Sequence, residues 1–281
     1  MAEQTSNITQ NQLLLRVLSA AIVLALIGSA YWLLEDWGLK FFVLMAVLIG
    51  SRELNRVLFG KAELRTKSII FYIFNLLIFL LSAWRPQLSG LFYSFFFVCF
   101  CVCLISLNRR HNNLGELSIY QAKAALGFFY VGLLPSFAYQ LITLPSGKFW
   151  FISLLCIVFA GDIGAYFVGR KFGNKKIMPL ISPKKTVAGA LGGLAFSTLA
   201  GLLCSQFFPQ IMVWKFTILA LFTGVIAQYG DFFESLLKRV ANLKDSGGLM
   251  PGHGGVLDRI DGVLFACPVF LLGAIMLEKV I

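Results

Sequence analysis

The sequence predicts an all-α fold: a polytopic integral membrane protein with about nine transmembrane helices and a cytoplasmic N-terminus. Three observations support this prediction: the composition, the length of the apolar runs, and the distribution of basic residues between them. Of the 281 residues, 58% are hydrophobic and 13% are charged, and the mean hydropathy is +0.82. A soluble domain could not bury that much apolar surface, so soluble classes are excluded.

The apolar runs are long enough to cross the hydrocarbon core of a bilayer as helices, which takes about 20 residues each. They are too continuously apolar for the alternating strands of a membrane barrel, and helices satisfy their own backbone groups in lipid. The first run is longer than a typical signal-peptide core and no small-residue cleavage site follows it, so we interpret it as a retained helix. The nine runs are 17–34, 39–58, 69–84, 91–107, 122–144, 149–169, 187–207, 213–230 and 260–280.

Basic residues are concentrated in alternate loops between these runs. Of the 24 Lys and Arg residues, 19 fall in one set of loops. The positive-inside rule places that set in the cytoplasm, so the N-terminus is inside and, after an odd number of spans, the C-terminus is outside. The net charge of +11 therefore reports orientation and attraction to anionic headgroups rather than nucleic-acid binding. The 19 residues lie at position 16 and within 52–67, 109–123, 170–185 and 238–259.

The two halves of the chain differ in character. Residues 1–120 contain hydrophobic runs with no acidic residue in the middle of a run, whereas from residue 149 onward Gly is frequent and ionisable residues enter or abut the runs. We therefore expect residues 1–120 to be N-terminal transmembrane helices for lipid access or dimerisation, and 121–281 to be a catalytic transmembrane domain. The six Cys all lie in apolar runs, and their spacing indicates neither a metal site nor a disulfide framework.

Charge is most crowded between the last two runs. Asp231 and Glu234 are three residues apart, on one face of a helix, and Lys238 follows one turn later. Asp258 and Asp261 repeat this spacing at the start of the last run. Two helix ends with carboxylates at one membrane level can hold a hard cation such as Mg²⁺, which prefers a few carboxylates, water and phosphate oxygens. We predict Asp231, Asp258 and Asp261 as metal ligands; the alternative is a flexible, solvated loop.

The same stretch carries bases and glycines that suit a phosphate ligand. Glycine lets the backbone approach a ligand closely. His253 stands among the glycines as a candidate metal ligand, acid–base group or phosphate donor, although hard Mg²⁺ argues against ligation. The bases expected to neutralise phosphate are Lys238, Arg239, Lys244 and Arg259, and the glycines are Gly247, Gly248, Gly252, Gly254 and Gly255.

Two further features lie upstream. Asp162 is inside an apolar run, where a charge is costly and is usually paired or functional; the alternative is a structural hydrogen bond to another helix. The segment Ser182-Pro183-Lys184-Lys185-Thr186 precedes a run, and a helix N-terminus with a nearby Lys favours bound phosphate. The alternative for this segment is a positive-inside loop with no ligand, and the residues alone leave both interpretations open.

Together these residues resemble the signature of the phosphatidate cytidylyltransferase, or CDP-diacylglycerol synthase, family. The resemblance covers most of the C-terminal half. Two positions depart from the family pattern: Ile163 stands where a small hydroxyl residue is usual, and Ala188 where an acidic residue is common. The matching segments are Asp162-x-x-Ala165-Tyr166-x-x-Gly169, Ser182-Pro183-Lys184-Lys185-Thr186, Gly230-Asp231-x-x-Glu234-Ser235, Lys238-Arg239, Lys244-Asp245, Pro251-Gly252-His253-Gly254-Gly255 and Asp258-Arg259-Ile-Asp261.

The resemblance implies a multi-pass enzyme of the bacterial inner membrane with its active site facing the cytoplasm. Such an enzyme would condense CTP with phosphatidate to give CDP-diacylglycerol and pyrophosphate. Relatives use Mg²⁺ with a monovalent cation such as K⁺, and similar proteins form homodimers. We expect Asp162 near the lipid phosphate or a second cation. The residues expected to contact substrate are Ser182, Lys184, Lys185, Thr186, Lys238, Arg239, Lys244, His253, Gly254, Gly255 and Arg259.

Three other functions are weighed against this one. A CDP-alcohol phosphotransferase needs four aspartates in a longer two-helix pattern, of which Asp258-x-x-Asp261-Gly262 is only a fragment. A CTP-dependent polyprenol kinase is closer in kind, but it would release CDP and not pyrophosphate. An ion or phosphate transporter is suggested by Asp162, yet it predicts ionisable residues along the whole path, and here they are concentrated at the cytoplasmic side.

Overall fold

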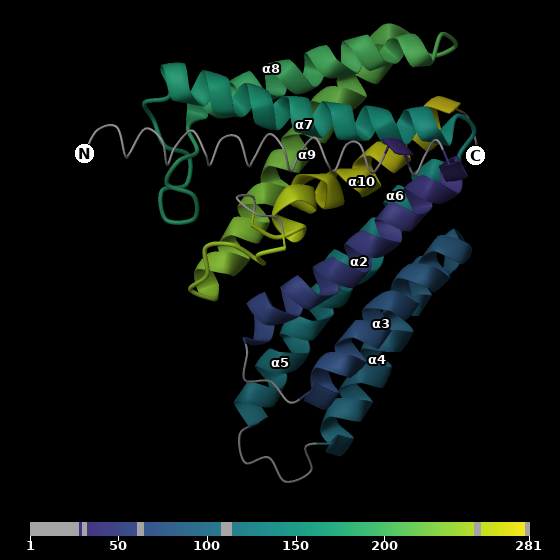
Figure 1. Cartoon of the computed structure of the whole chain (residues 1–281), viewed down its shortest axis with the longest axis vertical. Helices are drawn as coiled ribbons and strands as arrows, with labels where there is room; N and C mark the ends of the chain where they lie inside the picture. The colour runs from purple at the N-terminus through teal and green to yellow at the C-terminus, as the bar shows by residue number, and fades with distance from the viewer. Residues whose placement is uncertain (1–27, 30–32, 61–64, 108–113, 250–253, 279–281) are drawn as a thin grey trace.

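The computed structural model is a bundle of long helices (Figure 1) and describes residues 28–29, 33–60, 65–107, 114–249 and 254–278. Within these ranges it contains helices and turns but no strand; an isolated bridge pairs Lys176 with Thr186. The helices are α2 (Asp36–Phe59), α3 (Arg65–Trp84), η1 (Pro86–Leu88), α4 (Ser89–Leu107), α5 (Leu114–Gly127), η2 (Phe128–Leu133), α6 (Leu134–Thr143), α7 (Gly147–Phe172), α8 (Val187–Cys204), η3 (Ser205–Phe207), α9 (Val213–Val240) and α10 (Leu257–Glu278).

Seven helical segments of the described chain are long and apolar enough to cross a membrane, which confirms the all-α, multi-pass prediction. They correspond to the third to ninth predicted runs. The second run is α2, whose 24 residues include five charged ones, and it is not among the seven. The first run lies almost entirely outside the described residues, so nine spans and a cytoplasmic N-terminus stay predictions. The seven are Thr66–Trp84, Pro86–Ser106, Leu114–Thr143, Gly147–Phe172, Val187–Phe207, Val213–Val240 and Leu257–Glu278.

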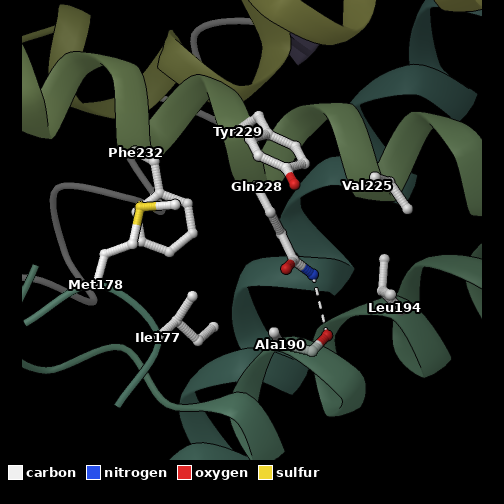
Figure 2. Close-up of a pocket in the computed structure, with 8 residues that line it drawn as sticks. All are labelled: Ile177, Met178, Ala190, Leu194, Val225, Gln228, Tyr229 and Phe232. Atoms are coloured by element: carbon white, nitrogen blue, oxygen red, sulfur yellow. Dashed lines mark hydrogen bonds between the residues drawn. The ribbon is translucent and has the colours of Figure 1, made fainter.

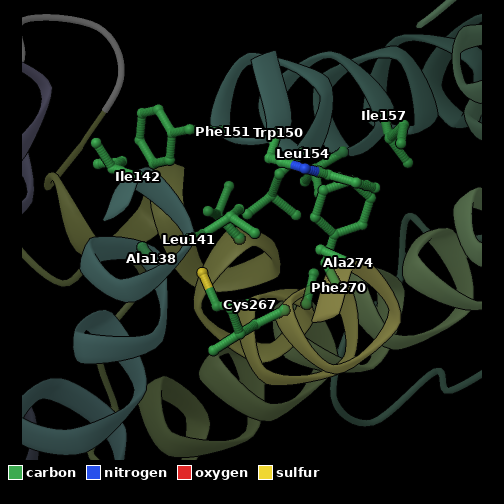
Figure 3. Packing of buried hydrophobic residues seen from close by; sticks show 14 of the residues in the cluster. Ala138, Leu141, Ile142, Trp150, Phe151, Leu154, Ile157, Cys267, Phe270 and Ala274 are labelled. Atoms are coloured by element: carbon green, nitrogen blue, oxygen red, sulfur yellow. The ribbon is translucent and has the colours of Figure 1, made fainter. Parts of the chain in front are cut away.

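Helix α10 lies at the centre of the bundle. In Figure 1 it lies between the α7 and α8 pair on one side and α2 and α6 on the other, with α3 and α4 beyond them. Its residues enter both buried apolar clusters: Phe270 packs with Trp150 of α7 (Figure 3), while Leu264 packs with Tyr130 and its neighbours. The position of the first turn of α10 therefore depends on packing against both halves of the chain.

Helices α7 and α8 pack closely because small residues face each other along their seam. A Cβ added at Gly193 would lie 2.9 Å from the Gly161 carbonyl oxygen and 3.1 Å from the Ala165 Cβ. Ser197, one turn further along α8, donates a hydrogen bond to the Ile157 carbonyl at 2.9 Å. Small residues that let backbones approach, with a hydroxyl bond across the seam, are a common solution for helices in lipid.

The predicted run 122–144 is one continuous helical segment, Leu114–Thr143, with a change of pitch inside it. A π-helical stretch, η2, separates α5 from α6, and Pro135 stands at the start of α6. Proline lacks the N–H for an i→i−4 bond and crowds the carbonyl there, so the wider turn accommodates it. The stretch carries Tyr130, which is fully buried.

Replacing Gly193 with Ala should lower the thermal stability of the purified protein, because the new methyl group meets the Gly161 carbonyl of a neighbouring helix. We expect a cost of about 1–3 kcal/mol from overpacking. Gly90→Ala is the matched control, since nothing lies within 4 Å of its Cβ position and Ala is favoured over Gly in helices. Equal Tm values for the two variants in detergent would contradict the close α7–α8 contact.

Candidate active site

The acidic residues predicted from the sequence lie where the C-terminal part of α9 meets the first turns of α10. Asp231 and Glu234 occupy successive turns of α9, and Asp258 and Asp261 do so on α10. The two helices come close because Gly230 has no side chain: a Cβ there would lie 2.5 Å from the Asp261 carbonyl oxygen. The spacing of three residues places each pair of carboxylates on one face of its helix, and Glu234 and Asp258 meet between the two helices through Lys238.

Lys238 joins the two helices electrostatically. Its Nζ donates to Glu234 Oε2 at 2.8 Å and to Asp258 Oδ1 at 2.5 Å, and its side chain is only 11% exposed. Charge-assisted bonds of this kind are stronger than neutral ones, and more so away from water. One cation thus compensates two buried carboxylates, which fixes the last turns of α9 against the first turn of α10.

Asp258 holds the loop that connects the two helices. Its Oδ2 accepts hydrogen bonds from the Ser246 N–H at 2.9 Å, the Ser246 hydroxyl at 2.9 Å and the Gly255 N–H at 2.7 Å. With Lys238 on Oδ1, both oxygens are engaged by donors of the chain itself. The prediction that Asp258 is a metal ligand therefore requires a metal to take the place of one of these donors.

Glu234 and Asp261 are less completely satisfied. Both are buried, at 2% and 8% exposure, and their carboxyl groups are neighbours. Asp261 Oδ1 accepts from the Gly262 N–H at 2.7 Å, but no donor among the described residues reaches Glu234 Oε1. Two neighbouring buried carboxyl groups favour a proton or a cation at this place.

The basic segment predicted to bind phosphate reaches this cluster. Lys185 forms an ion pair with Asp231, Nζ to Oδ2 at 2.5 Å, and its Nζ lies 4.1 Å from the centre of the Phe232 ring. The segment is held by backbone bonds from Ile177 to Lys185 and from Val187 to Lys175. Thr186 ends it as the N-cap of α8, accepting from the Gly189 N–H at 3.2 Å. The segment is thus ordered and paired with the acidic helix end, while phosphate binding by it, as opposed to a basic loop with no ligand, stays a prediction.

The other predicted residues surround the cluster at varying distance. Arg239 donates to the Ile181 carbonyl at 3.2 Å and so links α9 to the basic segment. Asp162 on α7 is exposed and lies within electrostatic range of Asp231, Lys185 and Arg259. Gly254 adopts φ +84°, which favours glycine. His253 and Gly252 lie outside the described residues. Of the rest, Lys184, Lys244 and Arg259 are exposed, Ser182 is half-buried and Gly255 is buried, while the departures Ile163 and Ala188 are exposed and half-buried.

Two residues near the cluster are not predicted from the sequence. Glu53 of α2 accepts hydrogen bonds from the Val256 and Leu257 N–H groups. Tyr130 packs its ring against Phe233 and Phe265, with centroids 5.1 and 5.8 Å away, and its buried hydroxyl has no hydrogen-bond partner among the described residues. In sequence, Glu53 stands beside Arg52 at the end of an apolar run, where it looks like part of a solvated loop. The sequence signal nearest to Tyr130 is Pro135, five residues later, which marks the change of pitch.

Comparison with known proteins gives this arrangement a family. Residues 14–276 match the model of the "Cytidylyltransferase family". The chain belongs to this family. A "Phosphatidate cytidylyltransferase" of Synechocystis sp. is 30% identical over 95% of the chain and 98% of its own length. Proteins of the same name from Brucella suis and Bacillus subtilis are 42% and 39% identical, over 55% and 51% of the chain and 58% and 54% of their own lengths.

Membership in the cytidylyltransferase family makes the protein a nucleotidyltransferase. The matched residues include every carboxylate of the cluster and the basic segment that pairs with Asp231. Such an enzyme must bring two anionic groups together, so bases beside acids at the end of a membrane helix pair suit the chemistry. The recognition of the family and the enzyme class predicted from the sequence are thereby confirmed.

Lys238→Met should strongly destabilise the protein, because it leaves Glu234 and Asp258 buried without their shared cation. We expect a loss of about 3–5 kcal/mol, seen as a lower Tm in detergent. Lys244→Met is the control, since Lys244 is exposed. Adding Glu234→Gln to Lys238→Met should recover part of the loss by removing one uncompensated charge. A Tm for Lys238→Met equal to that of Lys244→Met would disprove the bridging role.

Proposed function

We propose that the protein transfers the cytidylyl group of CTP to phosphatidate at the α9–α10 carboxylate cluster, giving CDP-diacylglycerol and pyrophosphate. The observation that carries the proposal is the Lys185–Asp231 ion pair, which joins the basic segment to the acidic helix end. The relatives named for this activity support the choice of substrates. The role is a step of phospholipid biosynthesis.

In the proposed reaction an oxygen of the phosphatidate phosphate attacks the α-phosphorus of CTP. A new P–O bond forms, the bond to the oxygen that bridges the α- and β-phosphates breaks, and pyrophosphate leaves with the electron pair. The nucleophile is already ionised at neutral pH, so no general base is required. The main barrier within reach of the protein is repulsion between two anions, which fixed cations reduce.

The chain supplies those cations on both sides of the carboxylates. The Lys185 Nζ already lies 2.5 Å from Asp231 Oδ2. A phosphate that binds beside this ammonium group would be stabilised by its positive charge. Lys238 is placed between Glu234 and Asp258. The exposed bases would bind the β- and γ-phosphates and release them with the leaving group; we propose Lys184, Arg239, Lys244 and Arg259 for this role, with His253, Gly254 and Gly255 contributing donors.

The carboxylate cluster fits a divalent cation. The observation that supports this is Glu234 Oε1, a buried oxygen that no donor among the described residues reaches, on a carboxyl group next to that of Asp261. In the described residues no three His, Cys, Asp or Glu side chains converge on a metal position, so a bound Mg²⁺ would need water and phosphate oxygens among its ligands. We propose Asp231, Asp258 and Asp261 as its ligands, with Glu234 adjacent, and a K⁺ ion as a second cation. Bound Mg²⁺ would neutralise phosphate oxygens and align the substrates.

A cavity of about 220 Å³ between α8, α9 and the basic segment would hold an acyl chain of the lipid substrate. Figure 2 shows its wall, where Leu194 comes from α8 and Val225 from α9, and where Gln228 donates to the Ala190 carbonyl at 3.0 Å. Phe232 lines the cavity and also lies under the Lys185 Nζ. A lipid with a chain in this cavity would therefore present its phosphate to Lys185.

The seven apolar helices make the chain a multi-pass membrane protein. We propose the bacterial inner membrane as its location, with the cluster facing the cytoplasm, because the loops that surround it carry most of the basic residues. CTP would reach the cluster from the cytoplasm while the lipid enters from the side. A homodimer is proposed from the family resemblance, with residues 1–120 serving lipid access or dimerisation.

The proposal is tested with purified protein, phosphatidate, CTP and Mg²⁺. We expect pyrophosphate and a CDP-lipid; release of CDP instead would indicate a kinase, and no turnover would favour a transporter. Asp261→Asn and Asp231→Asn should each lower turnover at least about 100-fold, because each removes a charge on which transition-state stabilisation depends. Asp36→Asn, in the first turn of α2, is the control for membrane insertion and protein yield. Wild-type-like turnover in either site variant would reject the assignment.

Leu194→Trp should fill the cavity and raise the KM for long-chain phosphatidate about tenfold. In binding free energy, this rise corresponds to the loss of roughly two buried methylene groups of the acyl chain. The KM for CTP and for a short-chain phosphatidate should stay unchanged, because neither uses the cavity. Leu191→Trp, on the same helix but 64% exposed, is the matched control. An equal effect of Leu194→Trp on long and short chains would show that the cavity does not hold an acyl chain.

A further inference from the structure

Glu53 is an acid of α2 that is buried beside the loop preceding α10. Its side chain is 7% exposed, and in the part of the chain that the structure describes it forms no ion pair. Oε1 accepts from the Val256 N–H at 3.1 Å; Oε2 accepts from the Leu257 N–H at 2.8 Å and from the Ser246 hydroxyl at 3.3 Å. A buried carboxylate is tolerated only where donors replace water, and here all of them belong to one loop and one helix end.

The two backbone donors are groups that a helix cannot satisfy internally. The first N–H groups of an α-helix have no carbonyl partner and carry partial positive charge. A Ser, Thr, Asp or Asn just before a helix accepts from the N–H groups of the second or third helical residue, so an N-cap side chain in place of Val256 would not serve these two donors. Glu53 accepts from both of them, from another helix about 200 residues away in sequence. Asp258 accepts from Gly255 and Ser246, so the two carboxylates divide the donors of this turn between them.

The glycines of the loop make room for Glu53. A Cβ added at Gly255 would lie 2.5 Å from Glu53 Oε2, and one at Gly247 would lie 2.7 Å from Glu53 Cδ. Both distances are shorter than real Cβ contacts allow. At these two positions glycine therefore serves the approach of a carboxylate from α2, in addition to any close approach of substrate.

We infer that Glu53 is a positioning residue: it fixes Ser246 and the turn formed by residues 254–257, and thereby sets the direction of Asp258, Lys238 and the first turn of α10. The chain of contacts is continuous, because Ser246 donates its N–H to Asp258, its single hydroxyl hydrogen is shared between Asp258 and Glu53, and Asp258 accepts from Lys238. Substrate does not need to touch Glu53 for this role. The claim that Glu53 affects activity rests on the proposed function. The claim that Glu53 holds the loop does not.

Glu53→Gln tests the inference because it keeps the size of the side chain but replaces one acceptor with an amide NH₂ that faces a donor. Glu35→Gln is the matched control: the same change just before the other end of α2, at an exposed position. In hydrogen–deuterium exchange on the full-length protein in detergent, we expect the amides of 254–258 to exchange at least tenfold faster in Glu53→Gln. Peptides from the α7–α8 seam should stay unchanged in both variants.

Kinetics distinguish positioning from general loss of folded enzyme. The KM for CTP should rise about tenfold in Glu53→Gln while the KM for phosphatidate changes less than twofold, because the acyl cavity lies on α8 and α9. A smaller folded fraction would lower the apparent kcat and move neither KM. Glu53→Asp, which keeps the charge at shorter reach, should recover part of the effect. If Glu53→Gln does not fold, Gly247→Ala replaces it in both measurements, because the added methyl group would push the loop away from the Glu53 carboxyl group.

Unchanged exchange at 254–258 in Glu53→Gln, or equal changes in both KM values, would overturn the inference. If the wild-type protein turns over no CTP, the proposed function fails, and the exchange measurement still decides whether Glu53 holds the loop.

Discussion

The compensation of negative charge at one end of the helix bundle is the constraint on which the rest of this structure depends. Glu53, Asp231, Glu234, Asp258 and Asp261 gather there, and burial makes each uncompensated charge costly. Lys238 serves two of them, Lys185 serves a third, and N–H and hydroxyl donors serve Glu53 and the second oxygen of Asp258. Among the described residues, Asp261 is left without a cationic partner, and the second oxygen of Glu234 is left without a donor. The proposed cation would compensate these two groups.

Close backbone packing is what brings these groups to one level. Gly230 lets α9 approach the Asp261 carbonyl, and Gly193 lets α8 approach α7. Because α7 and α8 are joined by the basic segment, their close packing fixes where that segment begins and ends. Lys185 meets Asp231 as a consequence. A larger residue at either glycine would separate elements whose charges compensate one another, so the apolar seams and the polar site depend on the same few positions.

The sequence predicts the parts of this arrangement that depend on residues close together in the chain, and it does not predict those that depend on distant residues. Asp231, Glu234 and Lys238 follow from helical spacing, and Thr186 at the entry to α8 follows from local capping chemistry. Glu53 does not, because its donors are about 200 residues away and no local pattern marks them. Tyr130 is also hidden, since the π-helical turn that carries it arises from Pro135 together with tertiary packing. Asp258 was predicted as a metal ligand from its spacing alone; spacing cannot show that four donors of the chain already occupy its oxygens.

In the proposed reaction Lys185 would connect the lipid side of the site to the nucleotide side. Its ammonium lies over Phe232, whose ring also lines the apolar cavity, and it pairs with Asp231 at the edge of the carboxylate cluster. A lipid phosphate that binds here would compete with Asp231 for the same ammonium. In the proposed reaction this competition would free Asp231 when the lipid binds, and the carboxylate would then be available to the proposed cation. Binding of the lipid and completion of the cation site would thus be coupled through one side chain.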